Sequence, residues 1–306
     1  MNVSVKSKKS LPVLALICSV LWALAYPLIK LGYRELNIAP NDLGSKVLFA
    51  GVRFLFAGAL VLLITGAVNH TGKKISKSAW GWLLLFALVN TSLHYLCSYI
   101  GLGYIPSARG TIIDSTGSFM LIILSCIIFS DDRMSWNKVL GCVLGFSGIV
   151  ILNVEPGKFM FENISFMGDG MILLNAVFAA FGGVVGRLVS RKMDMTLATG
   201  ISMAIGGAFL CLVGLCIGVE QPWHLSALGI AIIIALTLIS AISFSIYNTL
   251  LAYHPISTVA IYNAFIPIFG VGFSSLILGE RFMWKYLIAG ILVAVGIIAV
   301  NYKKIK

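Results

Sequence analysis

The sequence contains few charged residues: they make up 11% of its 306 positions, whereas a soluble protein carries roughly a quarter. Hydrophobic residues account for 59% of the chain. Length alone would allow about two ordinary soluble domains, but soluble domains need more charge at their surface. The composition therefore argues against a soluble protein and predicts that nearly all of the chain lies in lipid.

Paired cysteines and phosphate-binding loops are also missing from the sequence. The six cysteines all lie inside apolar segments and none belongs to a CxxC pair, so we expect neither disulfide bonds nor a zinc site. No GxxxxGK[ST] loop is present, and no soluble domain is available to hold one. We therefore expect no cofactor, no metal site and no drive by ATP hydrolysis within this chain.

The net charge of +11 does not indicate a nucleic-acid partner, because the lysines fall in short clusters between apolar runs and not on one soluble basic face. Membrane topology explains these clusters better. If the N-terminus is cytoplasmic, 14 lysines and arginines lie on the cytoplasmic side and 6 on the external side. The positive-inside rule therefore favours a multi-pass protein of the plasma (cell inner) membrane with both termini in the cytoplasm.

Ten apolar segments approach the ~20 residues that a membrane-crossing helix needs. Because these segments lack the alternating pattern of strands, they predict an all-α bundle of ten transmembrane helices. The first segment, which follows Lys6–Lys9, also fits a cleaved signal peptide, but its removal would leave an odd set of nine. The predicted segments are roughly 11–31, 46–67, 79–103, 107–129, 137–153, 168–189, 196–218, 225–251, 256–278 and 283–301.

A stretch of the sequence occurs twice, half a chain apart. "DDRMSWNKVLGCVLGFSGIVILN" (131–153) aligns without a gap with "GERFMWKYLIAGILVAVGIIAVN" (279–301), at a constant offset of 148. Two homologous halves are therefore expected, residues 1–154 and 155–306, with five helices each. Because five is odd, the halves must lie in the membrane in opposite orientations, and such inverted repeats are a common architecture of secondary transporters. The identical pairs are Arg133/Arg281, Trp136/Trp284, Leu144/Leu292, Gly148/Gly296, Ile149/Ile297 and Asn153/Asn301.

Three further motifs carry a family resemblance. They are "GER" (279–281) twelve residues after Pro267, "WALAYPLIK" (22–30) and "VRFLFAG" (52–58). With the repeat, they make almost the whole chain similar to the drug/metabolite transporter (DMT) superfamily, specifically to ten-helix transporters with two EamA-type domains. This resemblance implies a secondary transporter that moves small organic metabolites, such as amino acids, by alternating access, most simply as an exporter.

The two halves differ at the fourth helix of each. The first half reads "STGSF" (115–119) where the second has the proline-bearing "AFIPIF" (264–269), so the fourth span is expected to be straighter than the ninth. Asp114 also introduces a carboxylate where the second half offers Tyr262 or Asn263. Substrate choice is expected to depend on that difference.

Ionisable residues inside membrane spans are costly and therefore candidates for function. Arg53, His94 and Asp114 fall at a similar predicted depth, which makes them a candidate charge and coupling network. A purely structural role remains open for two of these residues. Arg53 could snorkel or bind backbone carbonyls, and Asp114 could be the structural partner of Arg53 or Arg109.

Helical spacing places polar and small residues on one face of two spans. Such a face suits either a cavity wall or close packing between helices. The third span carries Asn90, His94, Cys97/Ser98 and Gly101 on this face, and the fourth carries Gly110, Asp114 and Ser118.

Aromatic and amide residues complete the predicted site. Trp22 and Tyr26 are one turn apart on the first span, and Ser240, Ser243 and Tyr247 share a face of the eighth. Flat apolar surfaces with few polar groups suit a small amphipathic ligand. The predicted substrate-binding residues are Trp22, Tyr26, His94, Asp114, Asn175, Phe178, Tyr247 and Asn263.

Two other functions stay open at this point. A proton-coupled efflux transporter of organic cations could use Asp114 as its counter-charge, and an integral membrane enzyme would need a catalytic set of which only Asp114 and His94 are present. The expected partners are a small-molecule substrate, protons as coupling ions and membrane lipid, with the protein a monomer or weak dimer. We expect a transporter and not an enzyme.

Overall fold

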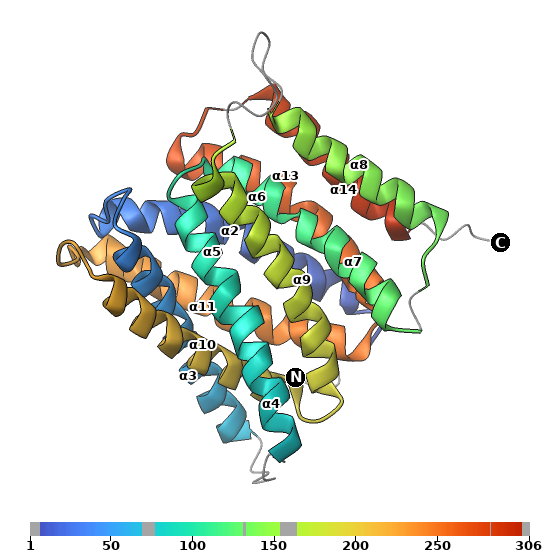
Figure 1. Cartoon of the computed structure of the whole chain (residues 1–306), viewed down its shortest axis with the longest axis horizontal. Helices are drawn as coiled ribbons and strands as arrows, with labels where there is room; N and C mark the ends of the chain where they lie inside the picture. The colour runs from blue at the N-terminus through green and yellow to red at the C-terminus, as the bar shows by residue number, and fades with distance from the viewer. Residues whose placement is uncertain (1–6, 69–76, 131–132, 154–163, 282, 302–306) are drawn as a thin grey trace.

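The computed structural model describes residues 7–68, 77–130, 133–153, 164–281 and 283–301, and in these residues it contains helices and no strand (Figure 1). The helices coincide with the ten predicted spans. Eight of the resulting segments are long and apolar enough to cross a membrane. The segments are α2 (Leu11–Glu35), α3 (Leu43–Val68), α4–η1–α5 (Lys77–Ala87, Leu88–Leu93, His94–Leu102), α6–α7 (Ser107–Asp114, Thr116–Ile128), α8 (Trp136–Asn153), η2–α9 (Phe166–Gly170, Met171–Ser190), α10 (Met195–Ile217), α11 (Ala227–Tyr253), α12–η3–α13 (Ile256–Ala260, Ile261–Ala264, Phe265–Leu278) and α14 (Trp284–Asn301).

Two equivalent helices, α3 of the first half and α10 of the second, lie against each other along most of their length (Figure 1). Each carries three glycines spaced by seven residues, and a Cβ atom on any of these would approach the opposite helix within ~3 Å. The first glycine of α3 meets the end of α10 and the last meets its beginning, so the two helices run antiparallel. The two halves therefore have opposite orientations, as the repeat predicted. The glycines are Gly44, Gly51 and Gly58 on α3 and Gly200, Gly207 and Gly214 on α10.

The remaining contacts repeat the same symmetry. Helix α2 packs on α11 and α13, and its counterpart α9 packs on α5 and α7. The last helices of the halves, α8 and α14, pair with each other at the edge of the bundle opposite to α3 and α10 (Figure 1). Each half therefore contributes its first, third and fourth spans to a shared centre. The expected boundary at 154/155 lies outside the described residues.

The fourth span is not one continuous helix, because it is interrupted at Ser115, between α6 and α7. That it is straighter than the ninth span stays a prediction. No proline causes the break. Hydroxyl groups donate to carbonyls of their own helix instead: Thr111 to Ala108, Ser115 to Thr111 and Thr116 to Ile113, at 2.8, 2.7 and 2.7 Å. Such bonds compete with the helical ladder and bend helices.

The ninth span is interrupted at the equivalent place. The 3₁₀ turn η3 precedes Pro267, which lacks the N–H that would bind the carbonyl of Asn263. Ser19 on α2 donates to the neighbouring carbonyl of Tyr262 at 2.8 Å. Both halves thus break their fourth helix at the centre of the bundle, by different chemistry.

Candidate functional site

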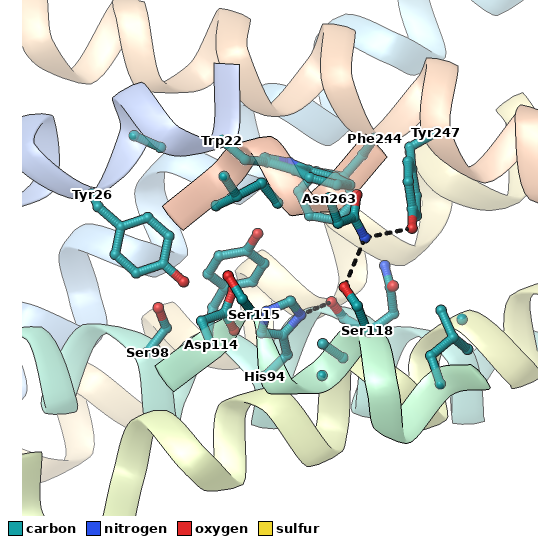
Figure 2. A pocket seen from close by; sticks show the side chains of 18 of the residues that line it. Trp22, Tyr26, His94, Ser98, Asp114, Ser115, Ser118, Phe244, Tyr247 and Asn263 are labelled. Atoms are coloured by element: carbon teal, nitrogen blue, oxygen red, sulfur yellow. Dashed lines mark hydrogen bonds between the residues drawn. The ribbon is translucent and has the colours of Figure 1, made fainter. Parts of the chain in front are cut away.

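A cavity of about 110 Å³ lies at the centre of the bundle, between the two interrupted spans. It is lined by residues from both halves, on α2, α3, η1–α5, α6–α7, α9, α11 and η3–α13. Figure 2 shows Trp22, Phe244 and Tyr247 along one side and His94, Ser98 and Asp114 along the other. The site therefore lies at the interface of the repeats.

Asp114, the last residue of α6, is partly buried at the cavity wall. Nδ2 of Asn175 on α9 donates a hydrogen bond to its Oδ1. Tyr26 on α2 lines the same cavity. Among the described residues, no lysine, arginine or histidine lies within ion-pairing distance of Asp114. Its charge, when the group is ionised, is therefore not offset by a cation of the described chain.

Trp22 and Asn263 anchor the opposite wall. The ring of Trp22 meets Tyr247 edge-on at 4.6 Å between centroids and lies 5.3 Å from Phe244. Nδ2 of Asn263, at the break of the ninth span, donates to the hydroxyl of Tyr247 at 2.9 Å and to Oγ of Ser118 at 3.1 Å (Figure 2). The Ser118 bond joins the two broken spans across the cavity.

His94 begins α5 directly after the π-helical segment η1. Its Nδ1 lies 3.2 Å from the carbonyl oxygen of Asn90, and its ring stacks on Tyr95 with centroids 4.2 Å apart. π-helical turns are frequent at functional sites. This turn brings the cavity-lining residues Asn90 and His94 to the same wall.

Arg53 is the cation of the cavity wall and only 1% of its surface is exposed. Its Nε donates to Oγ of Ser240 at 2.7 Å and to the carbonyl of Leu236 at 3.1 Å, both on α11. Its Nη1 donates to the hydroxyl of Tyr99 at 3.0 Å. All these partners are neutral.

Three buried polar atoms at the cavity have no hydrogen-bond partner in the described part of the chain: Trp22 Nε1, Asn90 Nδ2 and Asn263 Oδ1. Buried polar groups are normally hydrogen-bonded. These atoms can therefore serve a ligand, two as donors and one as an acceptor.

Carboxylates also tie helix ends together away from the cavity. Glu280, from the GER motif, accepts hydrogen bonds from the backbone N–H groups of Ser107 and Ala108 at 2.9 and 3.1 Å and from Oγ of Ser107 at 3.0 Å. A carboxylate is favoured at such a helix N-terminus. Lys30 lies 3.8 Å from Glu280, and Arg109 pairs with Asp169 at 2.6 Å.

Comparison with known sequences places the chain in a family. The model of the EamA-like transporter family matches residues 10–154 and, a second time, residues 166–302. The chain belongs to the EamA-like transporter family. The separate match of each half agrees with the internal repeat.

Several relatives of this EamA-like transporter are themselves named as transporters. "Uncharacterized transporter YvbV" of Bacillus subtilis is 27% identical over 290 residues, which cover 93% of this chain and 89% of the relative. An uncharacterized transporter of Archaeoglobus fulgidus is 23% identical, with 93% and 95% covered. A chloroplastic WAT1-related protein of Arabidopsis thaliana is 27% identical over 83% of this chain and 62% of its own length.

A solved crystal structure has the same fold as this EamA-like transporter. It superposes with a TM-score of 0.72 and covers 96% of this chain and 97% of its own, at 16% sequence identity. At that identity the likeness supports the fold alone. The family and the fold are thus shown, and the cargo is a separate question.

The cavity of this EamA-like transporter brings together most of the predicted site residues, although their role in binding stays a prediction. Asn175 lies behind Asp114 and orients it. The predicted network of Arg53, His94 and Asp114 shares one cavity, but the described residues show no ion pair among the three. The predicted residues that line the cavity are Trp22, Tyr26, Arg53, His94, Asp114, Tyr247 and Asn263.

Phe178 does not line the cavity, contrary to its placement in the predicted site. On one face of α9, Ala179 and Gly183 line the cavity, and Asn175, one helical turn before Ala179, bonds to the cavity residue Asp114. Successive residues of a helix are turned by ~100°, so Phe178 points away from that face. Its proximity to Asn175 in the sequence was misleading.

The polar faces of the third and fourth spans combine both predicted roles. Asn90, His94 and Ser98 line the cavity, whereas Gly101 packs on Ile172. On the fourth span, Asp114 and Ser118 line it, whereas Gly110 approaches Leu102 and Tyr26.

Sequence reasoning missed several lining residues, among them Tyr95, Ser115, Phe244 and Asn248. On α11, Phe244, Tyr247, Asn248 and Leu251 follow the i, i+3, i+4, i+7 spacing of one helix face. That spacing was a usable signal. The predicted face through Ser240 and Ser243 instead holds Arg53 and bonds to its own backbone.

Proposed function

We propose that this EamA-like transporter is a secondary transporter that exports small organic metabolites bearing an amino group, amino acids among them, across the plasma membrane. The observation that carries the proposal is Asp114, a carboxylate at the central cavity whose hydrogen bond in the described part of the chain comes from the neutral amide of Asn175. A substrate ammonium group would supply the missing counter-charge, in a charge-assisted hydrogen bond.

The surrounding wall suits such a molecule. Trp22, Tyr26 and Tyr247 offer aromatic surface to its apolar part, and ring faces also attract cations. Cavities for small organic ligands combine such surface with a few placed polar groups. The unpartnered polar atoms of Trp22, Asn90 and Asn263 would fix the orientation of the bound substrate through hydrogen bonds.

The inverted halves support alternating access as the mechanism. Two halves of opposite orientation can exchange conformations, so that one fixed site at their interface opens to either side of the membrane in turn. Because the sequence has no phosphate-binding loop, the driving force is the substrate gradient or a coupled proton. We assign the proton to Asp114, which substrate and proton would then occupy alternately. The proposal includes no catalytic step.

Export of organic cations is the second candidate function. The aromatic rings around Asp114 favour it, because a cation lacking a carboxylate would find the same counter-charge and the same ring faces. The two functions differ in whether a carboxylate on the ligand strengthens or weakens binding.

Counterflow in liposomes tests the proposal. The purified full chain is reconstituted without nucleotide and offered a panel of amino acids and amines, with and without a pH gradient. Uptake of at least one class is expected, and Asp114→Asn should fold but lose amine selectivity or its dependence on pH. The matched control is Glu220→Gln, which changes an exposed carboxylate that does not line the cavity.

Two outcomes would contradict the proposal. A strict requirement for ATP would exclude secondary transport by this chain alone. A folded Asp114→Asn protein with unchanged rate, selectivity and pH profile would remove Asp114 from the mechanism.

A further inference from the structure

Arg53 is a buried cation that forms no ion pair with a carboxylate in the described part of the chain. Its guanidinium remains charged in proteins, and the described residues place no carboxylate within ion-pairing distance of it. The rings of Phe54 and Tyr95 lie 4.9 and 5.7 Å from its Cζ, within the range of cation–π attraction. Neutral hydroxyls, a carbonyl and ring faces therefore stabilise this charge only in part.

One edge of the guanidinium is available to a ligand. Nε and Nη1 donate to groups on α11 and α5, but Nη2 makes no hydrogen bond within the described chain. Arg53 lines the central cavity although its exposed fraction is 1%. Its planar fork of donors matches the two oxygens of a carboxylate.

The opposite charge in the same cavity is Asp114, and the two are kept apart. Tyr26 and Tyr95 line the same cavity as both charged residues. A direct ion pair would have offset the cost of burying both charges. Instead, α3 and α11 hold one charge, and α6 and α9 hold the other.

A purely structural role explains only part of this arrangement. Hydrogen bonds from Arg53 to Ser240 and Tyr99 do connect α3 with α11 and α5. Such a tie needs neither the free Nη2 edge nor a position on the cavity wall. It also does not explain why the carboxylate of the same cavity is bonded to the neutral amide of Asn175 and not to a cation of the described chain.

We infer that Arg53 binds the carboxylate of the transported molecule while Asp114 faces its amino group, so that the site selects molecules carrying both charges. This inference rests on the proposed function. It separates the two candidate functions, because an organic cation without a carboxylate would leave Arg53 unpaired. Arg53 is then a specificity-determining residue of the site.

Matched ligands test the inference on the purified full chain. The first set is leucine, 3-methylbutylamine and 4-methylpentanoate; the second is phenylalanine, 2-phenylethylamine and 3-phenylpropanoate. Each set keeps one side chain and removes either the carboxylate or the amino group. Affinities come from ligand-dependent thermal stabilisation.

We expect substitution of each charged residue to remove one of two binding preferences, that over the amine or that over the acid. The wild type should bind at least one of the two amino acids about 10- to 100-fold more tightly than its amine and its acid, the range of a charge-assisted hydrogen bond. Arg53→Gln should abolish the preference over the amine and keep that over the acid. Asp114→Asn should abolish the preference over the acid and keep that over the amine.

Arg109→Gln is the matched control, because Arg109 is a largely buried arginine that pairs with Asp169 and does not line the cavity. In this control, the affinity for the amino acid divided by that for the matching amine should equal the wild-type value. If the affinity ratio fell as much in Arg109→Gln as in Arg53→Gln, the inference would be overturned, since the loss of selectivity would then follow from general destabilisation. If Arg53→Gln does not fold, Arg53→Lys, which loses the fork, should lower the ratio at least about 5-fold.

Three further outcomes would overturn the inference. An unchanged amino-acid-to-amine ratio in folded Arg53→Gln, or in the substitute Arg53→Lys, would refute it and leave the proposed function standing. Equal wild-type affinity for amines and amino acids would refute it in favour of organic-cation transport. Binding of none of the six compounds would count against both the inference and the proposed function.

Discussion

The contact between α3 and α10 leads to a specific prediction about Gly51. A Cβ atom at this position would lie 2.5 Å from the backbone nitrogen of Cys211 and 2.9 Å from the carbonyl oxygen of Gly207. Ordinary contacts of a Cβ begin near 3.4 Å, so Gly51→Ala requires the two helices to separate locally by roughly 1 Å. Backbone atoms, unlike a side chain, cannot rotate away.

Overpacking of this kind costs typically 1–3 kcal/mol, and the rigid neighbours favour the upper end, about 3 kcal/mol. Alanine recovers about 1 kcal/mol through its better helix propensity. We therefore expect Gly51→Ala to lower the free energy of unfolding by about 2 kcal/mol, an equilibrium change of about 30-fold. The measurement is reversible unfolding of the purified protein in mixed micelles.

Gly66 on the same helix is the matched control, because a methyl group added at this position would have no atom within 4 Å among the described residues. Gly66→Ala should be neutral or stabilising by up to about 1 kcal/mol. Gly207→Ala, the symmetric change, should destabilise the protein about as much as Gly51→Ala. The double variant should lose less than the sum, since the helix separation that one methyl group forces also makes room for the other. Equal stability of Gly51→Ala and Gly66→Ala would refute the close approach of the two helices.

Three further predictions concern other parts of the molecule. Glu280→Ala should destabilise the protein by about 2 kcal/mol, because it removes the acceptor for the N–H groups at the start of α6, and equal unfolding curves for variant and wild type would contradict this cap. Trp22→Ala should raise the apparent KM of counterflow several-fold, whereas Phe178→Ala should leave it close to the wild type; the opposite ranking would misplace the cavity wall. A cysteine introduced near Asn2 should react with an impermeant reagent only in opened cells, and labelling of intact cells would reverse the proposed orientation of the termini.

The sequence by itself determined the spans and their division into two halves. The apolar length of a segment is a local property, and a bilayer admits helices of that length in almost any tertiary context. The repeat around Trp136 and Trp284 and the odd number of spans then required opposite orientations. The glycine contacts between α3 and α10 show that these equivalent helices run antiparallel, which agrees with that requirement.

Only the tertiary structure decided where helices break and which side chains meet. The fourth span is interrupted where the hydroxyls of Ser115 and Thr116 bond to the backbone, and these bonds depend on rotamers that a sequence pattern does not specify. The direction of a side chain around its helix likewise separated Asn175 from Phe178.

The two charged residues of the cavity also show which properties follow from the sequence and which follow from the packing. Hydropathy marked Arg53 and Asp114 as costly residues inside spans, but it could not tell an ion pair from two separately held charges. That distinction depends on distances between α3, α6, α9 and α11, which come from the packing of four helices far apart in the chain. The separation of the two charges, and with it the inferred selection for molecules that carry both, is a property of the folded bundle, because only packing brings Ser240 to one charge and Asn175 to the other.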